Sequence, residues 1–255
     1  MNEALSQAVR DYWDKNVANW KVANELKPGS PAFFQEVERY RFEKLSYLEK
    51  RVDYAAYQGK HLLDVGCGLG TDLSRFAAGG AVTTGIDISP VAVELAKKNF
   101  AWRNLPGKFA VMDGEALTFP DDSFDFIYCH TVFHFTANPT ALVAEIRRVL
   151  KPGGEALIMT INRRSWLYFL HQIAGVKLDY MDAPAFHKYS FDEFKQATDV
   201  FSQNDLIVER FPVHTEVHSG LKATLYNRFF VDFYNAMPNW LIGKSGYHLL
   251  SFVRK

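Results

Sequence analysis

Cysteine is scarce in this sequence of 255 residues, in which Cys67 and Cys129 are the only two examples. Two cysteines cannot supply the disulfide framework of a small secreted domain, and their spacing does not match a structural zinc site. We therefore expect both side chains to be free thiols.

The sequence also lacks long apolar runs and an excess of charge of either sign. No apolar segment approaches the roughly 20 residues that span a bilayer, and the first residues, MNEALSQAVRDYWDKNV, lack the pattern of a signal peptide. Lys and Arg number 29, as do Asp and Glu, so no strong positive field would attract nucleic acid or an anionic membrane. These absences predict a cytoplasmic protein whose partner is a small molecule, with neither nucleic acid nor a membrane as a partner.

Short β-rich apolar runs alternate with helical patterns between residues 60 and 160. The runs are HLLDV, AVTTGIDI, KFAVM, FDFIYC and EALIMTI. This alternation is typical of an α/β fold in which helices wind around both faces of a parallel sheet. Ser89 and Asn138, each followed by proline, are expected to cap two of the crossover helices. The KPGG segment at 151–154 is expected to end the second helix and turn into the next strand.

The pattern changes on both sides of this core. Residues 1–57 predict two amphipathic helices, which we expect to form a lid over a core domain at 58–255. Aromatic and irregular inserts that cap the core are expected at 162–200 and 214–243. The runs DLIVERFPV and YHLLSFVRK predict two further strands.

A glycine-rich turn follows the first strand, where Asp64, Gly66, Gly68 and Gly70 form the pattern D-x-G-x-G-x-G. Glycines at such a turn let the backbone approach a ligand closely, although a turn can also need glycine for structural reasons alone. A dinucleotide site has the different spacing G-x-G-x-x-G and binds phosphate at the helix N-terminus. Asp64 would repel phosphate and attract a sulfonium or ammonium group.

Two more acidic residues follow the next two strands. Asp87 ends the second strand, where a carboxylate can accept hydrogen bonds from both hydroxyls of a ribose. Asp113 ends the third strand and could accept a hydrogen bond from the amino group of adenine. Acids at three consecutive strand ends favour a positively charged nucleoside as the ligand.

The strings LDVGCGLG, GIDIS, DGEALTFPDDSFDFIYCHTVFH and RVLKPGG together resemble those of class I S-adenosylmethionine-dependent methyltransferases, in particular the small-molecule, type 11-like branch. The resemblance covers about residues 45–160. It implies a Rossmann-like, doubly wound seven-stranded sheet in the order 3-2-1-4-5-7-6 with strand 7 antiparallel. It also implies S-adenosyl-L-methionine as the cofactor and S-adenosyl-L-homocysteine as the product.

This resemblance places Asp64 and the turn glycines along the methionine part of the donor, Asp87 at the ribose, and Asp113 at the adenine. We expect Tyr12 and Trp20 to reach the donor from the N-terminal lid. The full set of expected donor-site residues in the core is Asp64, Gly66, Cys67, Gly68, Gly70, Asp87, Ile88, Met112, Asp113, Gly114, Cys129 and His130.

Two histidines follow the fourth strand in the string HTVFH. Either His130 or His134 could act as a general base for an acceptor that loses a proton. Packing is the alternative role, because transfer from a sulfonium depends mainly on proximity and alignment. Their i, i+4 spacing could hold a metal on a helix, but no third ligand is evident, so we expect no metal. The residues expected to line the acceptor pocket are Trp166, Tyr168, His171, Tyr226 and Phe230.

The sequence thus predicts a methyltransferase that acts on a small, apolar or aromatic acceptor. Two alternatives stay open, a nicotinamide-dependent oxidoreductase on a Rossmann-type fold and a non-catalytic protein that binds S-adenosylmethionine. The spacing of the glycine-rich turn weighs against the oxidoreductase. The non-catalytic protein would carry the same donor-site residues and differ only in turnover.

Overall fold

The computed structural model describes most of the chain. The described residues are 3–17, 20–166, 168–169, 180, 182–210, 229 and 231–255. The helices within them are α1 (Glu3–Lys15), the 3₁₀ helix η1 (Trp20–Ala23), α2 (Pro31–Lys44), α3 (Leu48–Arg51), α4 (Thr71–Ala78), α5 (Pro90–Arg103), α6 (Pro139–Val149), α8 (Phe191–Ala197), α10 (Val231–Ala236) and α11 (Asn239–Ile242). The strands are β1 (His61–Val65), β2 (Val82–Asp87), β3 (Lys108–Val111), β4 (Phe124–Cys129), β5 (Leu150–Ile161), β6 (Gln203–Glu209) and β7 (His248–Arg254).

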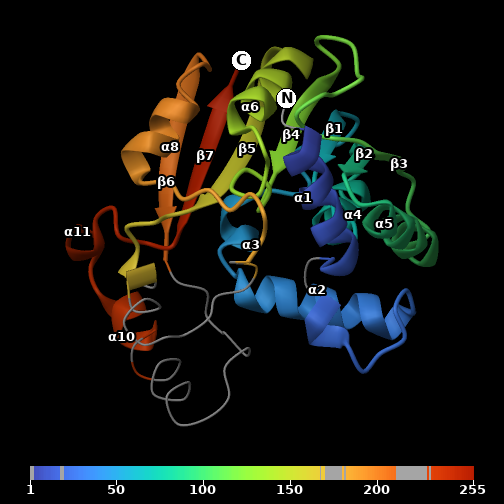
Figure 1. Ribbon diagram of the computed structural model, residues 1–255, viewed down its shortest axis with the longest axis horizontal. Coiled ribbons are helices and arrows are strands. Elements are labelled where there is room, and N and C mark those ends of the chain that lie inside the picture. The colour runs from blue at the N-terminus through green and yellow to red at the C-terminus, as the bar shows by residue number, and fades with distance from the viewer. Residues whose placement is uncertain are drawn as a thin grey trace.

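The described strands form one seven-stranded sheet in the order β3-β2-β1-β4-β5-β7-β6 (Figure 1). Strands β1 to β5 pair in parallel, whereas β7 runs antiparallel to both of its neighbours, β5 and β6. The predicted strand order and the antiparallel seventh strand are confirmed. The order reverses between β1 and β4, and the carboxyl ends of these two strands mark the usual ligand site of an open α/β sheet.

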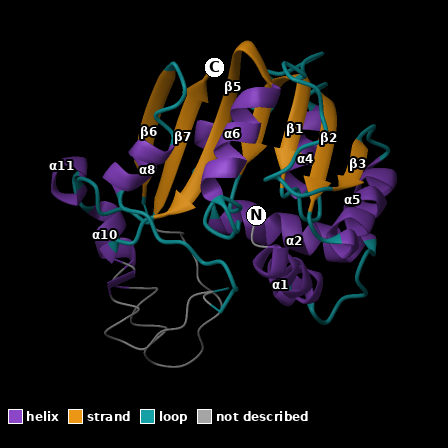
Figure 2. Ribbon diagram, turned by 45° about the horizontal axis from the view of Figure 1, so that its top comes forward, coloured by secondary structure: helices purple, strands orange, loops and turns teal. Residues whose placement is uncertain are grey.

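Helices cover both faces of the sheet (Figure 2). On one face, α6 and α8 bury Leu142, Ile146 and Phe194 in a cluster with the strands. On the other face, α4 buries Leu73 and Phe76. The central strands are therefore buried from both sides, which explains why β1 and β4 read as continuous apolar runs rather than alternating ones.

The predicted starts of two crossover helices are confirmed. The side chain of Ser89 accepts a hydrogen bond from the backbone N–H of Ala92 at the start of α5. The side chain of Asn138 does the same for Ala141 at the start of α6. In both helices proline occupies the first turn, where its missing N–H costs nothing because that group has no partner within the helix.

The expectation for the KPGG segment at 151–154 was right about the end of the helix, since α6 ends at Val149, but wrong about the turn. Instead of forming a turn before the strand, the segment lies inside β5, which begins at Leu150 directly after α6. The register between β4 and β5 shifts here, from Phe124 opposite Leu150 to Phe126 opposite Glu155. The additional residues are thus accommodated as an irregularity within the strand.

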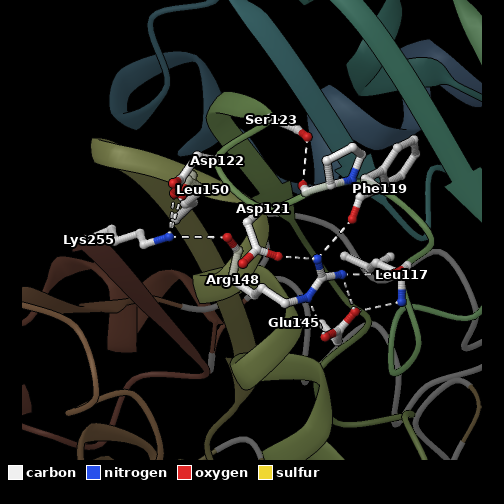
Figure 3. Close-up of polar contacts among 10 residues, drawn as sticks. Leu117, Phe119, Asp121, Asp122, Ser123, Glu145, Arg148, Leu150 and Lys255 are labelled. Atoms are coloured by element: carbon white, nitrogen blue, oxygen red, sulfur yellow. Dashed lines mark hydrogen bonds and ion pairs between the residues drawn. The ribbon is translucent and has the colours of Figure 1, made fainter.

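Arg148, near the end of α6, holds the loop that leads into β4 (Figure 3). Its guanidinium donates to the backbone oxygens of Leu117 and Phe119, each at 2.8 Å. It also pairs with the carboxylates of Asp121 and Glu145, each at 2.7 Å. Arg148 therefore joins two of the strings that carry the family resemblance, DGEALTFPDDSFD and RVLKPGG. These contacts stabilise the fold.

The N-terminal region contains more helices than predicted. Two were expected, but α1, η1, α2 and α3 are present among the described residues. Helix α2 begins after Ser30, which caps it by accepting from the N–H of Phe33 at 3.3 Å. Figure 2 shows α1 and α2 beyond the carboxyl ends of the parallel strands. No helix in the described ranges has the length and apolar character needed to cross a membrane.

Candidate functional site

The glycine-rich turn after β1 adopts a backbone that L side chains rarely reach. Gly66, Gly68 and Gly70 have φ angles of +71°, +52° and +69°. A Cβ atom at Gly66 would lie 2.2 Å from Cγ2 of Val132, and one at Gly70 would lie 3.2 Å from the ring of Phe100. At Gly68, by contrast, no atom of the described residues, apart from Gly68 itself and its two chain neighbours, lies within 4 Å of that position. Gly68 therefore leaves open space above the turn where a ligand could approach the backbone.

Asp87, at the end of β2, fixes this turn. Its Oδ2 accepts from the N–H of Gly68 and its Oδ1 from the N–H of Ser89, each at 2.9 Å. Burial raises the pKa of Asp87, while these two backbone donors act to lower it. Each carboxylate oxygen can accept a second hydrogen bond. Asp87 thus shapes the turn and still has capacity to bind hydroxyl groups.

The other two acids also lie at the carboxyl edge of the sheet. Asp64, in β1, is buried, and this burial and the nearby charge of Asp72 hold its pKa well above its usual range. Asp113 lies two residues beyond β3 and is half-buried, and burial raises its pKa. Its Oδ1 accepts from the N–H of Glu115 at 2.9 Å. A cationic ligand would offset the cost of keeping such carboxylates ionised.

Other residues of the expected donor site differ in their surroundings. Ile88 and Met112 are partly exposed beside Asp87 and Asp113 in the sequence. A Cβ atom at Gly114 would lie 2.8 Å from Cγ1 of Val65, so close packing is enough to explain this glycine.

The two cysteines are buried free thiols, as expected. Burial raises the pKa of both Cys67 and Cys129. The backbone N–H of Cys67 donates to the carbonyl of Ile86 at 2.9 Å, and Cys129 lies in the core cluster beneath α6. Their thiols are therefore neutral at physiological pH and are poor nucleophiles.

His130, the residue directly after β4, makes a hydrogen bond through each ring nitrogen. Arg41 Nη2 lies 3.1 Å from Nδ1, and the Tyr47 hydroxyl lies 3.0 Å from Nε2. Because a guanidinium can only donate, Nδ1 accepts, and the neutral ring carries its proton on Nε2 and donates it to Tyr47. Burial and the charge of Arg41 hold the pKa of His130 well below its usual range. His130 has no ring lone pair left to act as a base in this arrangement.

The partner of His130, Arg41, belongs to a buried ion pair that the sequence analysis missed. Arg41 lies on α2 and forms a bidentate pair with Asp72, in the first turn of α4, with Nε 3.0 Å from Oδ1. Both side chains are at most 10% exposed. This pair ties the N-terminal helices to the glycine-rich turn, since α4 begins at Thr71 directly after Gly70.

His134 differs from His130 in the hydrogen bonding of its ring nitrogens. It is fully buried, and neither ring nitrogen has a hydrogen-bond partner among the described residues. Its ring packs against Phe135 and Phe186, and its backbone carbonyl accepts from the N–H of His187 at 2.7 Å. Burial lowers the pKa of His134 to about 3, so the ring is neutral at physiological pH. Buried polar atoms without partners are costly, so these nitrogens are candidates to bind a polar group of a ligand.

Helix α1 contacts both sides of this region. Asp14 accepts from the hydroxyl of Ser89 at 2.6 Å, directly beside the residues that follow β2. Tyr12 donates to Asp182 at 2.8 Å, in the expected insert after β5. Trp20 begins η1, and its side chain lies outside the described residues.

Two of the expected acceptor residues border one cavity. Trp166 is half exposed, Tyr168 is buried, and both line a cavity beside the end of β5. His171, Tyr226 and Phe230 lie outside the described residues. Their expected role in an acceptor pocket stays a prediction.

Alanine substitutions at two turn glycines should separate packing from ligand binding. Gly66→Ala is expected to lower the free energy of unfolding by about 3 kcal/mol, because its Cβ would overlap Val132 at a positive φ. Gly68→Ala should cost only about 1 kcal/mol but weaken donor binding, because its Cβ would enter open space. Urea denaturation and titration calorimetry with S-adenosylhomocysteine measure the two effects. Equal losses of stability in both variants would contradict this distinction.

A seven-stranded sheet in this order, with β7 antiparallel and an acidic, glycine-rich turn after β1, defines a class I methyltransferase domain. The model of the family described as a methyltransferase domain matches residues 63–158. The match extends from β1 into β5 and includes the glycine-rich turn, Asp87 and both site histidines.

One curated relative and two solved structures are similar to this chain. A ubiquinone biosynthesis O-methyltransferase of Coxiella burnetii is 30% identical over 158 residues, which make up 62% of this chain and 62% of the relative. The chain thus matches less than two thirds of the length of that relative. Among solved structures, the cyclase SpnF has a TM-score of 0.61 at 19% identity and covers 98% of this chain and 96% of its own. A SAM-dependent methyltransferase from Aquifex aeolicus has a TM-score of 0.57 at 16% identity, with coverage of 88% and 98%. At these identities the structural likeness concerns the fold alone.

Proposed function

We propose that this chain transfers the methyl group of S-adenosylmethionine to a hydroxyl group on a small aromatic acceptor. The observation that carries this proposal is the open space at Gly68, in the turn after β1, where the strand order reverses. The carboxylate of Asp87 accepts from the N–H of Gly68, and Asp64 lies in β1 just before the turn. The name of the Coxiella relative, an O-methyltransferase of ubiquinone biosynthesis, supports oxygen as the accepting atom.

The residues at the carboxyl edge of the sheet fit this donor. When bound, S-adenosylmethionine supplies a methyl group activated by the positive charge on sulfur. The buried Asp64 would be stabilised in its ionised form by that charge. Asp87 has free lone pairs for ribose hydroxyls, and the half-buried Asp113 has them for the adenine amino group. The nicotinamide alternative fits less well, because these acids would repel a pyrophosphate at the same place.

At the acceptor side, we assign His134 rather than His130 to the hydroxyl group. Both nitrogens of His130 are occupied by Arg41 and Tyr47, whereas those of His134 are free among the described residues. His134 would accept the hydrogen bond of the hydroxyl and so align its oxygen with the methyl carbon. Because its pKa is about 3, the ring would not keep the hydroxyl proton, which would leave to solvent as the oxygen–methyl bond forms and the sulfur–methyl bond breaks. It would therefore act mainly by positioning.

We further propose that α1 and the rest of residues 1–57 form a lid, in which Tyr12 and Trp20 reach the donor. The contact of Asp14 with Ser89 supports this arrangement because it lies two residues beyond Asp87. The inserts at 162–200 and 214–243 would then select the acceptor.

An assay with methyl-labelled S-adenosylmethionine and a panel of phenols and catechols tests this function. We expect label in an aromatic ether, and we expect His134→Gln to lower kcat about 10²-fold with donor affinity unchanged. His61→Gln is the matched control, because His61 is exposed at the amino end of β1 and should have no effect. Absence of label in every hydroxylated acceptor would contradict the function. Full activity of His134→Gln would contradict only the role of that residue.

A further inference from the structure

The cavity beside the end of β5 carries a combination of side chains that the proposed methyl transfer does not require. It has a volume of about 580 Å³, within the range of small-molecule sites. Its wall consists of the segment that follows β5 together with one lysine from the loop before α8. The lining side chains that concern recognition are Arg163, Arg164, Trp166, Tyr168, Phe169 and Lys188.

The charge of this wall is positive and only partly neutralised. Arg163 pairs with Glu193 at 2.6 Å, and the neighbouring Asp192 pairs with Lys244 at 2.6 Å. Arg164 has no ion pair with a carboxylate within the described part of the chain, although both of these acids lie near enough to feel its charge. Asp192 and Glu193 are therefore already paired with other cations, and Arg164 is available to an anion.

Lys188 is likewise without an acidic partner in the described ranges. Its Nζ lies 5.1 Å from the ring centroid of Tyr168 and 5.5 Å from that of Phe186. Contacts between an ammonium group and aromatic rings hold the position of the charge without neutralising it. Lys188 and Arg164 thus present to one cavity two positive charges that form no ion pair with a carboxylate of the described residues.

The remaining wall is aromatic. Trp166 and Phe169 are each 51% exposed and meet edge to face, with their ring centroids 6.0 Å apart. Half-exposed rings of this size can cover the flat apolar surface of a ligand. The guanidinium of Arg164 can bind a carboxylate through two parallel hydrogen bonds. The lining therefore matches a molecule that combines an aromatic ring with a carboxylate.

The cavity is linked through the backbone to His134, the residue assigned above to the acceptor hydroxyl. The N–H of Arg163 donates to the carbonyl of Tyr189 at 2.8 Å, which joins the two segments of the wall. His187, next to Lys188, donates its N–H to the carbonyl of His134 at 2.7 Å. The short segment 187–189 thus contacts the backbone of His134 and also supplies Lys188 to the wall of the cavity.

From these contacts we infer that the cavity binds an aromatic carboxylate, and that the methyl acceptor is a hydroxylated aromatic acid held by its acid group at Arg164 and Lys188. The assignment of this acid to the acceptor rests on the proposed function. Binding of the acid to the cavity does not, because the cavity and its charges are independent of the donor.

The direct test is titration calorimetry of the full chain, without donor, with 2-naphthoate, 2-naphthamide and inorganic phosphate. The naphthoate should bind at least about tenfold more tightly than the uncharged amide, as expected for a charge-assisted hydrogen bond to a carboxylate. It should also bind at least about tenfold more tightly than phosphate, which has no ring to pack against the aromatic wall. Equal affinities for naphthoate and naphthamide, or for naphthoate and phosphate, would overturn the inference.

Variants identify the residues responsible. Arg164→Gln/Lys188→Gln should weaken naphthoate binding at least about tenfold and leave naphthamide unchanged. Both side chains are exposed, so the fold should survive this change. Lys97→Gln/Lys98→Gln on α5 removes the same charge from the opposite edge of the sheet and should leave both affinities unchanged. If the Arg164/Lys188 variant bound naphthoate normally, or if the α5 control weakened it equally, the cavity would not be the site.

Methyl transfer provides the second measurement. With hydroxylated aromatic acids as acceptors, Arg164→Gln/Lys188→Gln should raise KM about tenfold and leave kcat unchanged, because these residues act on binding alone. An unchanged KM would overturn the assignment of the acid to the acceptor. If no methyl transfer occurred although naphthoate bound as described, the proposed function would fail while the aromatic-acid site would stand.

Discussion

Asp87→Ala is expected to weaken the binding of S-adenosylhomocysteine by at least about 10²-fold, since hydrogen bonds to charged groups contribute about 1.5–3 kcal/mol each. The variant loses the acceptor for the N–H groups of Gly68 and Ser89 as well as any contact with the ligand. The turn at Gly68 would then have to be ordered by the ligand itself. Titration calorimetry measures the loss directly.

A partial substitution at Asp87 and a control at another aspartate test whether the loss is specific to this carboxylate. Asp87→Asn keeps one acceptor oxygen and should show an intermediate loss. Asp125→Asn is the matched control, because Asp125 also accepts a backbone N–H, from His61 at 2.8 Å, but lies at the amino end of β4. It should leave donor affinity unchanged. An unchanged dissociation constant in Asp87→Ala would remove the basis for placing the donor at this turn.

Arg41→Met is expected to lower the free energy of unfolding by about 3–5 kcal/mol, because it leaves the buried carboxylate of Asp72 without its partner. His130 would also lose the hydrogen bond to its Nδ1. Removal of both charges in Arg41→Met/Asp72→Leu should restore most of the lost stability, since no buried charge then remains unpaired. Urea denaturation of the three proteins gives the comparison.

Arg39→Met provides the control on the same helix. Arg39 forms two ion pairs, with Glu36 and Glu43, but its side chain is 45% exposed, so its loss should cost far less stability than the loss of Arg41. A similar loss of stability in Arg39→Met and Arg41→Met would mean that burial of the Arg41 ion pair does not determine the loss of stability. A double variant no more stable than Arg41→Met would lead to the same conclusion.

The fold was predictable from sequence because its signals are local. Strands β1 and β4 are short apolar runs, and α5 begins at a serine followed by proline, so each element can be recognised from its own residues. The positions of Asp64, Asp87 and Asp113 follow from the same reasoning, since each lies in or near the end of a recognisable strand. Their roles toward a ligand stay predictions.

The ion pair between Arg41 and Asp72 could not be predicted in this way. The two residues lie 31 positions apart, on α2 and α4, and nothing in either local pattern indicates that they meet. The same holds for the engagement of His130 by Arg41 and Tyr47, which changes the choice between the two candidate bases. Side-chain partners across elements depend on packing, which periodicity does not specify.

Helix α8 could have been predicted from the sequence but was missed. The segment 162–200 was expected to be irregular, yet α8 occupies part of it. Ser190 and Glu193 form a reciprocal capping box at its start, in which Ser190 accepts from the N–H of Glu193 and Glu193 accepts from the N–H of Ser190. This spacing, followed by the buried Phe194, is a recognised signal for a helix start.

The two contacts of α1 have a consequence for the thermodynamics of ligand binding. Asp14 joins this helix to Ser89 beside Asp87, and Tyr12 joins it to Asp182 in the insert after β5. A ligand that shifts α1 on one side thereby alters the free energy of the contact on the other. Coupling of this kind is reciprocal, so two ligands that both act through α1 must change each other's affinity by the same factor. A single helix can in this way make the occupancy of the donor site depend on the occupancy of the acceptor site, without any direct contact between the two ligands.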